Sequence, residues 1–215
     1  YFDANSIIFP RSSIYYHLKA WWLIAERRDQ KKRITGKFKK YEPGFLHIDI
    51  TYWPKIDGVK YYIHIAVDRA TRLMYLELHS DKKASTAAAF LESAIAFFPF
   101  HIHRVLTDNG KEYTLNNHKG NKESNLTWVF DLICEAYGIS HRRTEPYTPQ
   151  TNGLVERLNG TVKWATLKIH TYTNKEEMNS DLLGFMLIYI LERKHTSLMS
   201  EYRVKTPYQA LEHWY

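Results

Sequence analysis

The sequence predicts an α/β fold: a mixed five-stranded sheet with flanking helices, preceded by a helical and basic N-terminal segment. Three apolar segments with short connections come first, at residues 45–53, 60–67 and 73–79, which is typical of an antiparallel meander. Helical and strand patterns then alternate, so the later strands are expected to join the sheet through helices. This pattern alone fits several α/β folds.

The first of these strands, residues 45–53, alternates with period two and therefore has two different faces. One face is expected to carry the large side chains Leu46, Ile48, Ile50 and Tyr52. The other face carries His47, Asp49 and Thr51. Burying an unpaired carboxylate is costly, so Asp49 is expected to have a partner or a metal ion; the alternative is a strand-edge carboxylate without a role. His47 is interpreted as a satisfied core histidine.

The later elements follow from turn and cap signals. Residues 68–72 predict a hairpin turn, and Asp68 is interpreted as a turn residue rather than a site residue. Ser85 is expected to cap a helix that extends to Phe98. The remaining expected elements are a strand at 102–106, a helix at 127–137 that ends at Gly138, a strand at 139–143, helices at 153–170 and 175–193, and a short helix from Pro207.

These elements divide the chain into three parts. Residues 1–41 hold an N-terminal helix and a basic linker, residues 42–173 the α/β core, and residues 174–215 a C-terminal helical extension of the core. The N-terminal helix fits the last helix of a DNA-reading helix-turn-helix, or equally a packing or dimerisation helix. The linker is either a DNA-tracking segment or a solvated charge run; its cations are Arg27, Arg28, Lys31, Lys32, Arg33, Lys37, Lys39 and Lys40.

Composition narrows the class of partner. The net charge of +7 and the pI of about 9.3 suit a polyanion, but charge alone does not separate DNA, RNA and a membrane surface. No apolar run is long enough for a transmembrane helix, so we expect no membrane association. Cys134 is the sole cysteine, which rules out an intramolecular disulfide. With no secretory signal evident, a cytoplasmic location is expected, in a bacterium and on the chromosome.

Three acidic residues stand out as candidate metal ligands. Asp49 lies in the first strand, Asp108 follows the predicted strand at 102–106, and Glu156 lies in the predicted helix at 153–170. Carboxylates about 4 Å apart repel by roughly 4 kcal/mol per pair at an effective dielectric near 20, and a dication relieves that repulsion. Hard cations such as Mg²⁺ prefer such oxygen ligands.

Each acidic residue also has an ordinary interpretation. Asp108 precedes Asn109 and Gly110, which is a turn signal. Glu156 alone would be an ordinary helix carboxylate. Its spacing adds information, because Asn159 and Lys163 follow it at i+3 and i+7 and therefore share its helix face. A carboxylate, an amide and an ammonium in one row are suited to a metal ligand followed by phosphate contacts.

Three segments resemble the motifs of one family. They read HIDITY at 47–52, TDNGKEY at 107–113 and PYTPQTNGLVERLNG at 146–160. Together they resemble the integrase core superfamily of DDE transposases and retroviral-type integrases, and most of all the bacterial insertion-sequence transposases. The resemblance covers about residues 45–215, and its glutamate motif at 146–160 is the most specific part. It implies an RNase H-like fold and metal-dependent cleavage and joining of DNA.

The resemblance also implies roles for particular residues. Asp49, Asp108 and Glu156 would be catalytic and would hold two divalent ions, Mg²⁺ or Mn²⁺, with Asp49 bridging both. Contacts with DNA would come from Tyr147, Gln150, Asn152, Arg157, Asn159 and Lys163. DNA would be the partner, and a homo-oligomer on DNA is expected. One departure is the longer spacing between Asp108 and Glu156, whose excess is assigned to a polar loop at 115–127.

Three functions follow as hypotheses. The leading one is a DDE transposase or integrase-like recombinase that cleaves DNA and transfers strands. The enzymatic alternative is a nuclease on the same fold, acting on DNA or an RNA–DNA hybrid. The non-enzymatic alternative is a domesticated DNA-binding protein without joining activity.

Overall fold

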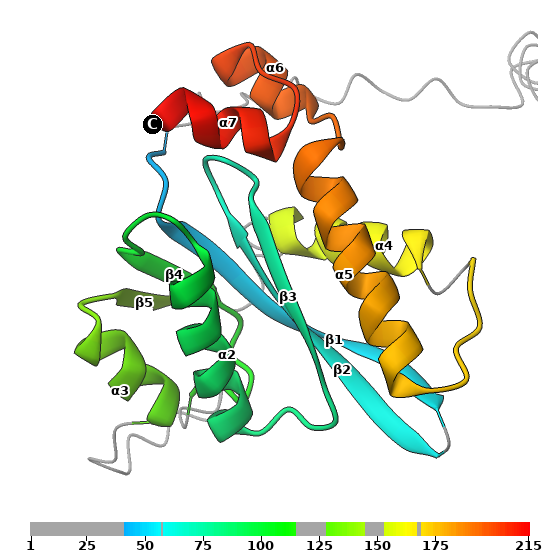
Figure 1. The fold of residues 1–215 in the computed structure, drawn as a ribbon. Coiled ribbons are helices and arrows are strands. Elements are labelled where there is room, and N and C mark those ends of the chain that lie inside the picture. The colour runs from blue at the N-terminus through cyan, green and yellow to red at the C-terminus, as the bar shows by residue number, and fades with distance from the viewer. Residues whose placement is uncertain (1–40, 57, 115–127, 145–152, 167–168) are drawn as a thin grey trace, which may run out of the picture. The chain divides into compact units, whose positions relative to one another are not determined.

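A five-stranded mixed sheet lies at the centre of the part of the chain that the structure describes (Figure 1). The structure is a computed structural model, and it describes residues 41–56, 58–114, 128–144, 153–166 and 169–215. The chain divides into two units, 1–39 and 40–215, and the description concerns the second unit. The expected N-terminal helix and basic linker, and the polar loop at 115–127, lie outside the described residues.

The strand order is β3-β2-β1-β4-β5. β1 (Phe45–Ile56), β2 (Val59–Asp68) and β3 (Met74–His79) pair antiparallel, as the meander pattern predicted. β4 (Arg104–Thr107) pairs parallel with β1, and β5 (Ser140–Arg143) pairs parallel with β4. The predicted mixed five-stranded sheet with flanking helices is therefore confirmed.

Helices cover both faces of this sheet. The helices are α2 (Ala84–Phe97), α3 (Val129–Ala136), α4 (Gly153–Ala165), α5 (Lys175–Leu191), α6 (Thr196–Tyr202) and α7 (Pro207–Trp214). Tyr75 of β3 stacks on Phe97 of α2 with 4.7 Å between ring centroids, so α2 covers the face to which odd-numbered β3 side chains point. α4 contacts β1 and β2, and α5 contacts β3. Asp49 of β1 bonds to α4, which places α4 on the face that carries Asp49.

The central strand β1 is buried on both faces over its first half. Leu46 and Ile48 point to one face and have no exposed surface, and His47 points to the other and is also buried. The alternation predicted for this strand is correct, because Asp49 pairs with Ile65 and Ile50 with His64 in register. A polar side chain on the second face therefore lies in a largely apolar setting.

Asp68 is a structural clamp at the end of β2, as the turn prediction implied. It is fully buried, and its two carboxylate oxygens accept five hydrogen bonds. The donors are the backbone N–H groups of Gly44, Phe45, Ala70 and Thr71 and the hydroxyl of Thr71. The hairpin between β2 and β3 is thereby tied to the residue at which β1 begins.

One sequence prediction about helices was wrong, and one helix was missed. α2 begins at Ala84 after Lys83, with no side-chain cap, so Ser85 is not its N-cap. The reason is that Asp81 already orders the approach to the helix, accepting from the Lys83 N–H at 3.0 Å and from the Thr86 hydroxyl at 2.5 Å. α6 was not predicted, because it is short and only Leu198 and Tyr202 within it are buried.

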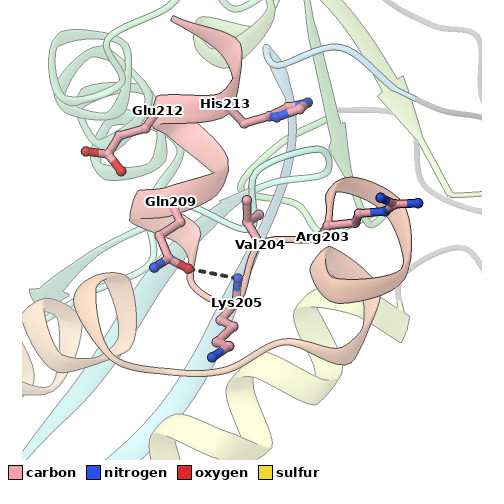
Figure 2. Close-up of a pocket in the computed structure, with 6 residues that line it drawn as sticks. All are labelled: Arg203, Val204, Lys205, Gln209, Glu212 and His213. Atoms are coloured by element: carbon pink, nitrogen blue, oxygen red, sulfur yellow. Dashed lines mark hydrogen bonds between the residues drawn. The ribbon is translucent and has the colours of Figure 1, made fainter.

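α6 bonds to the hairpin turn, and α7 packs on α5 and α6. The Arg72 Nε donates to the Ser197 hydroxyl at 3.3 Å, and the Tyr202 hydroxyl donates to the Tyr41 carbonyl oxygen at 3.4 Å. Thr206 and Gln209 form a capping box at the start of α7. A pocket lies between α7 and the connection that precedes it (Figure 2), lined by Arg203, Val204, Lys205, Gln209, Glu212 and His213. None of the candidate site residues lines this pocket.

Over the described ranges, no helix is long and apolar enough to span a membrane.

Candidate active site

Asp49 lies in the middle of β1 and is mostly buried. Its Oδ1 accepts a hydrogen bond from the Ile50 N–H at 2.9 Å. Burial, followed by the negative charge of Asp108, raises its pKa from the ordinary 3.8 to about 6, and the charge of Glu156 contributes in the same direction. The charges of Asp108 and Glu156 thus both act on Asp49, which places the three sequence-predicted acidic residues in one region of the structure.

Asp108 follows directly after β4 and lies in a turn. The Gly110 N–H donates to its Oδ1 at 2.9 Å, which closes the turn that the sequence indicated. The next residue, Asn109, donates through Nδ2 to the Thr144 carbonyl oxygen at 2.8 Å and so ties the turn to the end of β5. The parallel pairing of β1 and β4 sets Asp108 beside the Asp49 strand. The two interpretations of Asp108 are therefore compatible.

α4 supplies the third carboxylate and a hydrogen-bond donor. Asn159 Nδ2 donates to Asp49 Oδ2 at 2.7 Å, and Asn159 is itself buried. Glu156, one turn earlier, is exposed, and Lys163, one turn later, is half-buried. The helix buries Val155, Leu158 and Val162 on its apolar side. Of the face predicted from spacing, Asn159 is therefore the residue that bonds to β1.

The donor atoms at this place suit a hard divalent cation. They are carboxylate oxygens, together with the Asn159 Oδ1, a buried oxygen with no hydrogen-bond partner among the described residues. Oxygen ligands of this kind are preferred by Mg²⁺ and Mn²⁺. Within the described residues, no three His, Cys, Asp or Glu side chains are already arranged closely enough to hold a metal ion.

Tyr113 is a residue of this site that the sequence reasoning did not single out. Its side chain is 1% exposed, and its hydroxyl has no hydrogen-bond partner among the described residues. Burial raises its pKa well above 10, and the charges of Asp49 and Asp108 add to that shift. Its ring packs edge-on against Phe130 with 5.2 Å between centroids. No signal in the sequence distinguishes this phenol from an ordinary core aromatic residue.

The predicted DNA contacts are described only in part. Tyr147, Gln150 and Asn152 lie outside the described residues. Arg157 is exposed on α4, whereas Asn159 is buried and its Nδ2 donates to Asp49.

His47 is indeed buried, but neither ring nitrogen has a hydrogen-bond partner among the described residues. Within the described residues it is therefore a core histidine, as expected, but not a satisfied one. Burial lowers its pKa to about 4, aided by the positive charges of Arg69 and Arg72, so the ring is neutral at pH 7.

Comparison with protein families identifies the class to which this fold and site belong. Residues 40–149 match the integrase core domain family, and residues 137–201 match a second integrase core domain family. The first match spans more than half of the chain and contains Asp49 and Asp108. The chain belongs to the integrase core domain family.

Individual relatives agree with this assignment. The chain is 26% identical over 199 residues to a putative integrase, ORF3, of Spiroplasma virus SpV1-C74, covering 89% of the chain and 54% of that protein. It is 29% identical over 121 residues to the Gag-Pro-Pol polyprotein of sheep pulmonary adenomatosis virus, covering 56% of the chain and 6% of the polyprotein. The chain therefore spans about half of the first relative and a small part of the second.

Solved structures show the same fold. A chain of the simian T-cell lymphotropic virus intasome in complex with the PP2A regulatory subunit B56 gamma matches with a TM-score of 0.60 and 25% identity, covering 77% of this chain and 53% of that one. The HTLV-2 integrase catalytic core domain in complex with magnesium matches with a TM-score of 0.59 and 19% identity, covering 80% and 99%. The fold is therefore the RNase H-like fold of integrase catalytic cores.

Proposed function

We propose that this protein is a DDE-type transposase or integrase that cleaves DNA and joins DNA strands. The observation that carries the proposal is the convergence on Asp49: Asp108 and Glu156 both raise its pKa, and Asn159 bonds to it at 2.7 Å. These residues come from β1, from the end of β4 and from α4. Membership of the integrase core domain family supports the same class of reaction.

Asp49, Asp108 and Glu156 would hold divalent metal, Mg²⁺ or Mn²⁺, with two ions as the proposed number. Metal bound there would supply Lewis-acid stabilisation of the phosphorane-like charge and a lower pKa for the attacking hydroxyl. The magnesium-bound HTLV-2 core supports the choice of ion for this fold. The oxygen-only donor set of this chain fits that choice.

The protein side chains would orient and bind the DNA. Asn159 fixes the direction of the Asp49 carboxylate through its 2.7 Å hydrogen bond. Lys163 lies one turn beyond Asn159 on α4 and would contact a phosphate as a point charge. Arg157 is exposed and would add phosphate affinity without sequence preference. Tyr147, Gln150 and Asn152 stay proposed contacts from the motif alone.

A homo-oligomer on DNA is part of the proposal. α5 exposes several large apolar side chains, with exposed fractions of 56% for Leu187, 57% for Ile188 and 52% for Leu191. An apolar group of this kind on a helix surface is typical of a protein–protein contact. The intasome chain and the dimeric HTLV-2 core are assemblies of this fold, which supports the same expectation here.

A joining assay tests the proposal. The full chain is incubated in Mn²⁺ with short labelled duplexes, blunt or with recessed 3′ ends, and a supercoiled plasmid. Covalent transfer of label to the plasmid is the expected product. Asp49→Asn, Asp108→Asn and Glu156→Gln should each abolish transfer while retaining binding to the duplex.

Two results would contradict the proposal. Plasmid cleavage without any transfer of label would favour a nuclease on the same fold. Duplex binding with neither cleavage nor transfer would favour a DNA-binding protein without joining activity.

A further inference from the structure

A chain of hydrogen-bonded side chains leads from α3 to the backbone that carries Asp108. Asp131 Oδ1 of α3 lies 2.5 Å from His141 Nδ1 of β5. His141 Nε2 in turn lies 2.8 Å from the hydroxyl of Thr107, the last residue of β4. The same hydroxyl lies 2.9 Å from the carbonyl oxygen of Asp108. Three elements are thus connected at the residue directly before the candidate metal ligand.

The direction of the hydrogen bonds follows from the acidic end. An ionised carboxylate only accepts, so the His141 Nδ1 carries the proton that faces Asp131. Burial lowers the pKa of His141 below its ordinary value, and Asp131 only partly opposes this. The ring is therefore neutral near pH 7, and its Nε2 accepts. The Thr107 hydroxyl has one proton and two acceptors in reach, as in a three-centre hydrogen bond.

The order carboxylate, imidazole, hydroxyl is also that of a nucleophilic triad. The structure argues against this interpretation. Thr107 has no exposed surface and lies in β4, between β1 and β5, so a substrate cannot approach its hydroxyl. Asp131, at the far end of the chain, has a side chain that is 40% exposed. The solvent-facing end is therefore the carboxylate, and the hydroxyl faces the Asp108 backbone.

We propose that Asp131, His141 and Thr107 are positioning residues that fix the backbone at Asp108 and thereby aim its carboxylate toward Asp49. This inference rests on the proposed function of the site. Asp108 lies in a turn after a strand of only four residues, so the strand pairing holds it weakly on its own. The Thr107 hydroxyl adds a side-chain link at that point. Groups that orient metal ligands through hydrogen bonds commonly change metal affinity by about 10–100-fold when removed.

A matched pair of substitutions at Thr107 tests the proposal in the full chain. Thr107→Val keeps the shape and removes the donor, whereas Thr107→Ser keeps the donor. Mn²⁺ binding is measured by electron paramagnetic resonance and folding by thermal melts. We expect Thr107→Val to weaken Mn²⁺ binding by about 10–100-fold and Thr107→Ser to bind like the wild type. Thr166→Val is the control, because its buried hydroxyl donates to the Val162 carbonyl oxygen within α4 and not to a residue of the candidate site.

Asp131→Ala is a second variant. We expect it to fold, since the Asp131 side chain is partly exposed. It should weaken Mn²⁺ binding in the same direction as Thr107→Val. The ¹⁵N chemical shifts of the His141 ring report its tautomer without any metal or DNA. We expect the Nδ1–H tautomer in the wild type and a mixture of both tautomers in Asp131→Ala.

The possible results separate the inference from the function on which it rests. Wild-type Mn²⁺ affinity in both Thr107→Val and Asp131→Ala, or equal losses in Thr107→Ser and Thr107→Val, would overturn the inference. An Nε2–H tautomer in the wild type would also overturn it. A wild-type protein that neither binds Mn²⁺ nor joins DNA would overturn the proposed function, and the tautomer would still decide whether the hydrogen-bond chain exists.

Discussion

The carboxyl of Asp49 lies among neighbours that oppose its ionisation. Burial and the charge of Asp108 hold its pKa at about 6 in the folded protein, against 3.8 ordinarily. The folded state therefore keeps a proton that the unfolded chain loses between about pH 4 and pH 6. Since the unfolded state binds fewer protons in this window, the free energy of unfolding falls as the pH rises through it. Without metal, ionised Asp49 destabilises the fold above pH 6.

Asp49→Asn should therefore stabilise the metal-free protein at neutral pH. The gain in the free energy of unfolding is expected to be up to about 3 kcal/mol at pH 7.5, from a shift of roughly two pKa units. It should shrink toward zero below pH 4, where the wild-type carboxyl is protonated in both states. Urea unfolding of both proteins in chelator across this pH range measures the difference. A difference that does not change with pH would contradict the assigned pKa.

Tyr113 has a buried hydroxyl without a partner among the described residues, whereas the Tyr172 hydroxyl bonds to Asp181. An unpaired buried polar group costs about 1–3 kcal/mol. Tyr113→Phe should therefore raise the melting temperature by a few degrees, since about 1 kcal/mol shifts it by roughly 2–4 °C in a chain of this size. Tyr172→Phe, which breaks an existing bond, should lower it. A lower melting temperature for Tyr113→Phe would mean that its hydroxyl has a partner in solution.

At the scale of elements, the hairpin between β2 and β3 depends on Asp68. Its carboxylate accepts five hydrogen bonds and joins this hairpin to the start of β1. An amide at this position offers one acceptor oxygen and turns N–H groups toward backbone donors, so several of these hydrogen bonds cannot form. Asp68→Asn should lower the free energy of unfolding by about 3–5 kcal/mol, the range for breaking a buried charged network.

The matched control for this variant is Asp81→Asn. Asp81 also accepts from a backbone N–H and from a threonine hydroxyl, but its side chain is 39% exposed to solvent. Urea unfolding should show a much smaller loss for Asp81→Asn than for Asp68→Asn. Similar losses in both would mean that burial does not set the importance of the Asp68 clamp.

The sheet was predictable from sequence because its signals are local. The period-two run around Asp49 gave β1 and its two faces, and the turn residues gave the hairpin. The helix spacing of Glu156, Asn159 and Lys163 put Asn159 on the predicted face of α4, and Asn159 is the residue that bonds to β1. Each of these signals spans only a few turns or a single strand.

The rest depends on contacts between distant residues. Ser85 carries a cap signal, but Asp81 already orders that end of α2. The hydrogen bonds from Asp131 through His141 to Thr107 join positions up to 34 residues apart, so no single segment of the sequence predicts them. The same holds for Tyr113, whose burial beside two carboxylates is visible only once the strands are paired.

At the scale of the whole molecule, charge is the property that bears on a DNA partner. The chain carries a net charge of +7, and the segment from Arg27 to Lys40 holds eight of its cations. Each phosphate bound by such a cation releases counterions, so the affinity for DNA falls with salt. A linker that follows the DNA backbone would account for a large part of this dependence.

Replacing Lys31, Lys32 and Arg33 by alanine should therefore flatten the salt dependence of duplex binding. The slope of log affinity against log salt should decrease by up to about 0.9 for each phosphate that the linker no longer neutralises. Fluorescence anisotropy between low and moderate salt measures it. The control removes the same charge from exposed positions of the C-terminal extension, by alanine at Lys175, Lys194 and Lys205. An equal change of slope in both variants would assign the effect to net charge rather than to the linker.

The central proposal is that Asp49, Asp108 and Glu156 together hold divalent metal. Mn²⁺ binding by the full chain, measured by electron paramagnetic resonance at pH 7.5, tests this most directly. The wild type should bind Mn²⁺, and Asp49→Asn, Asp108→Asn and Glu156→Gln should each lose most of that binding while remaining folded. Undiminished Mn²⁺ binding in the three variants would show that the carboxylates do not form a common metal site.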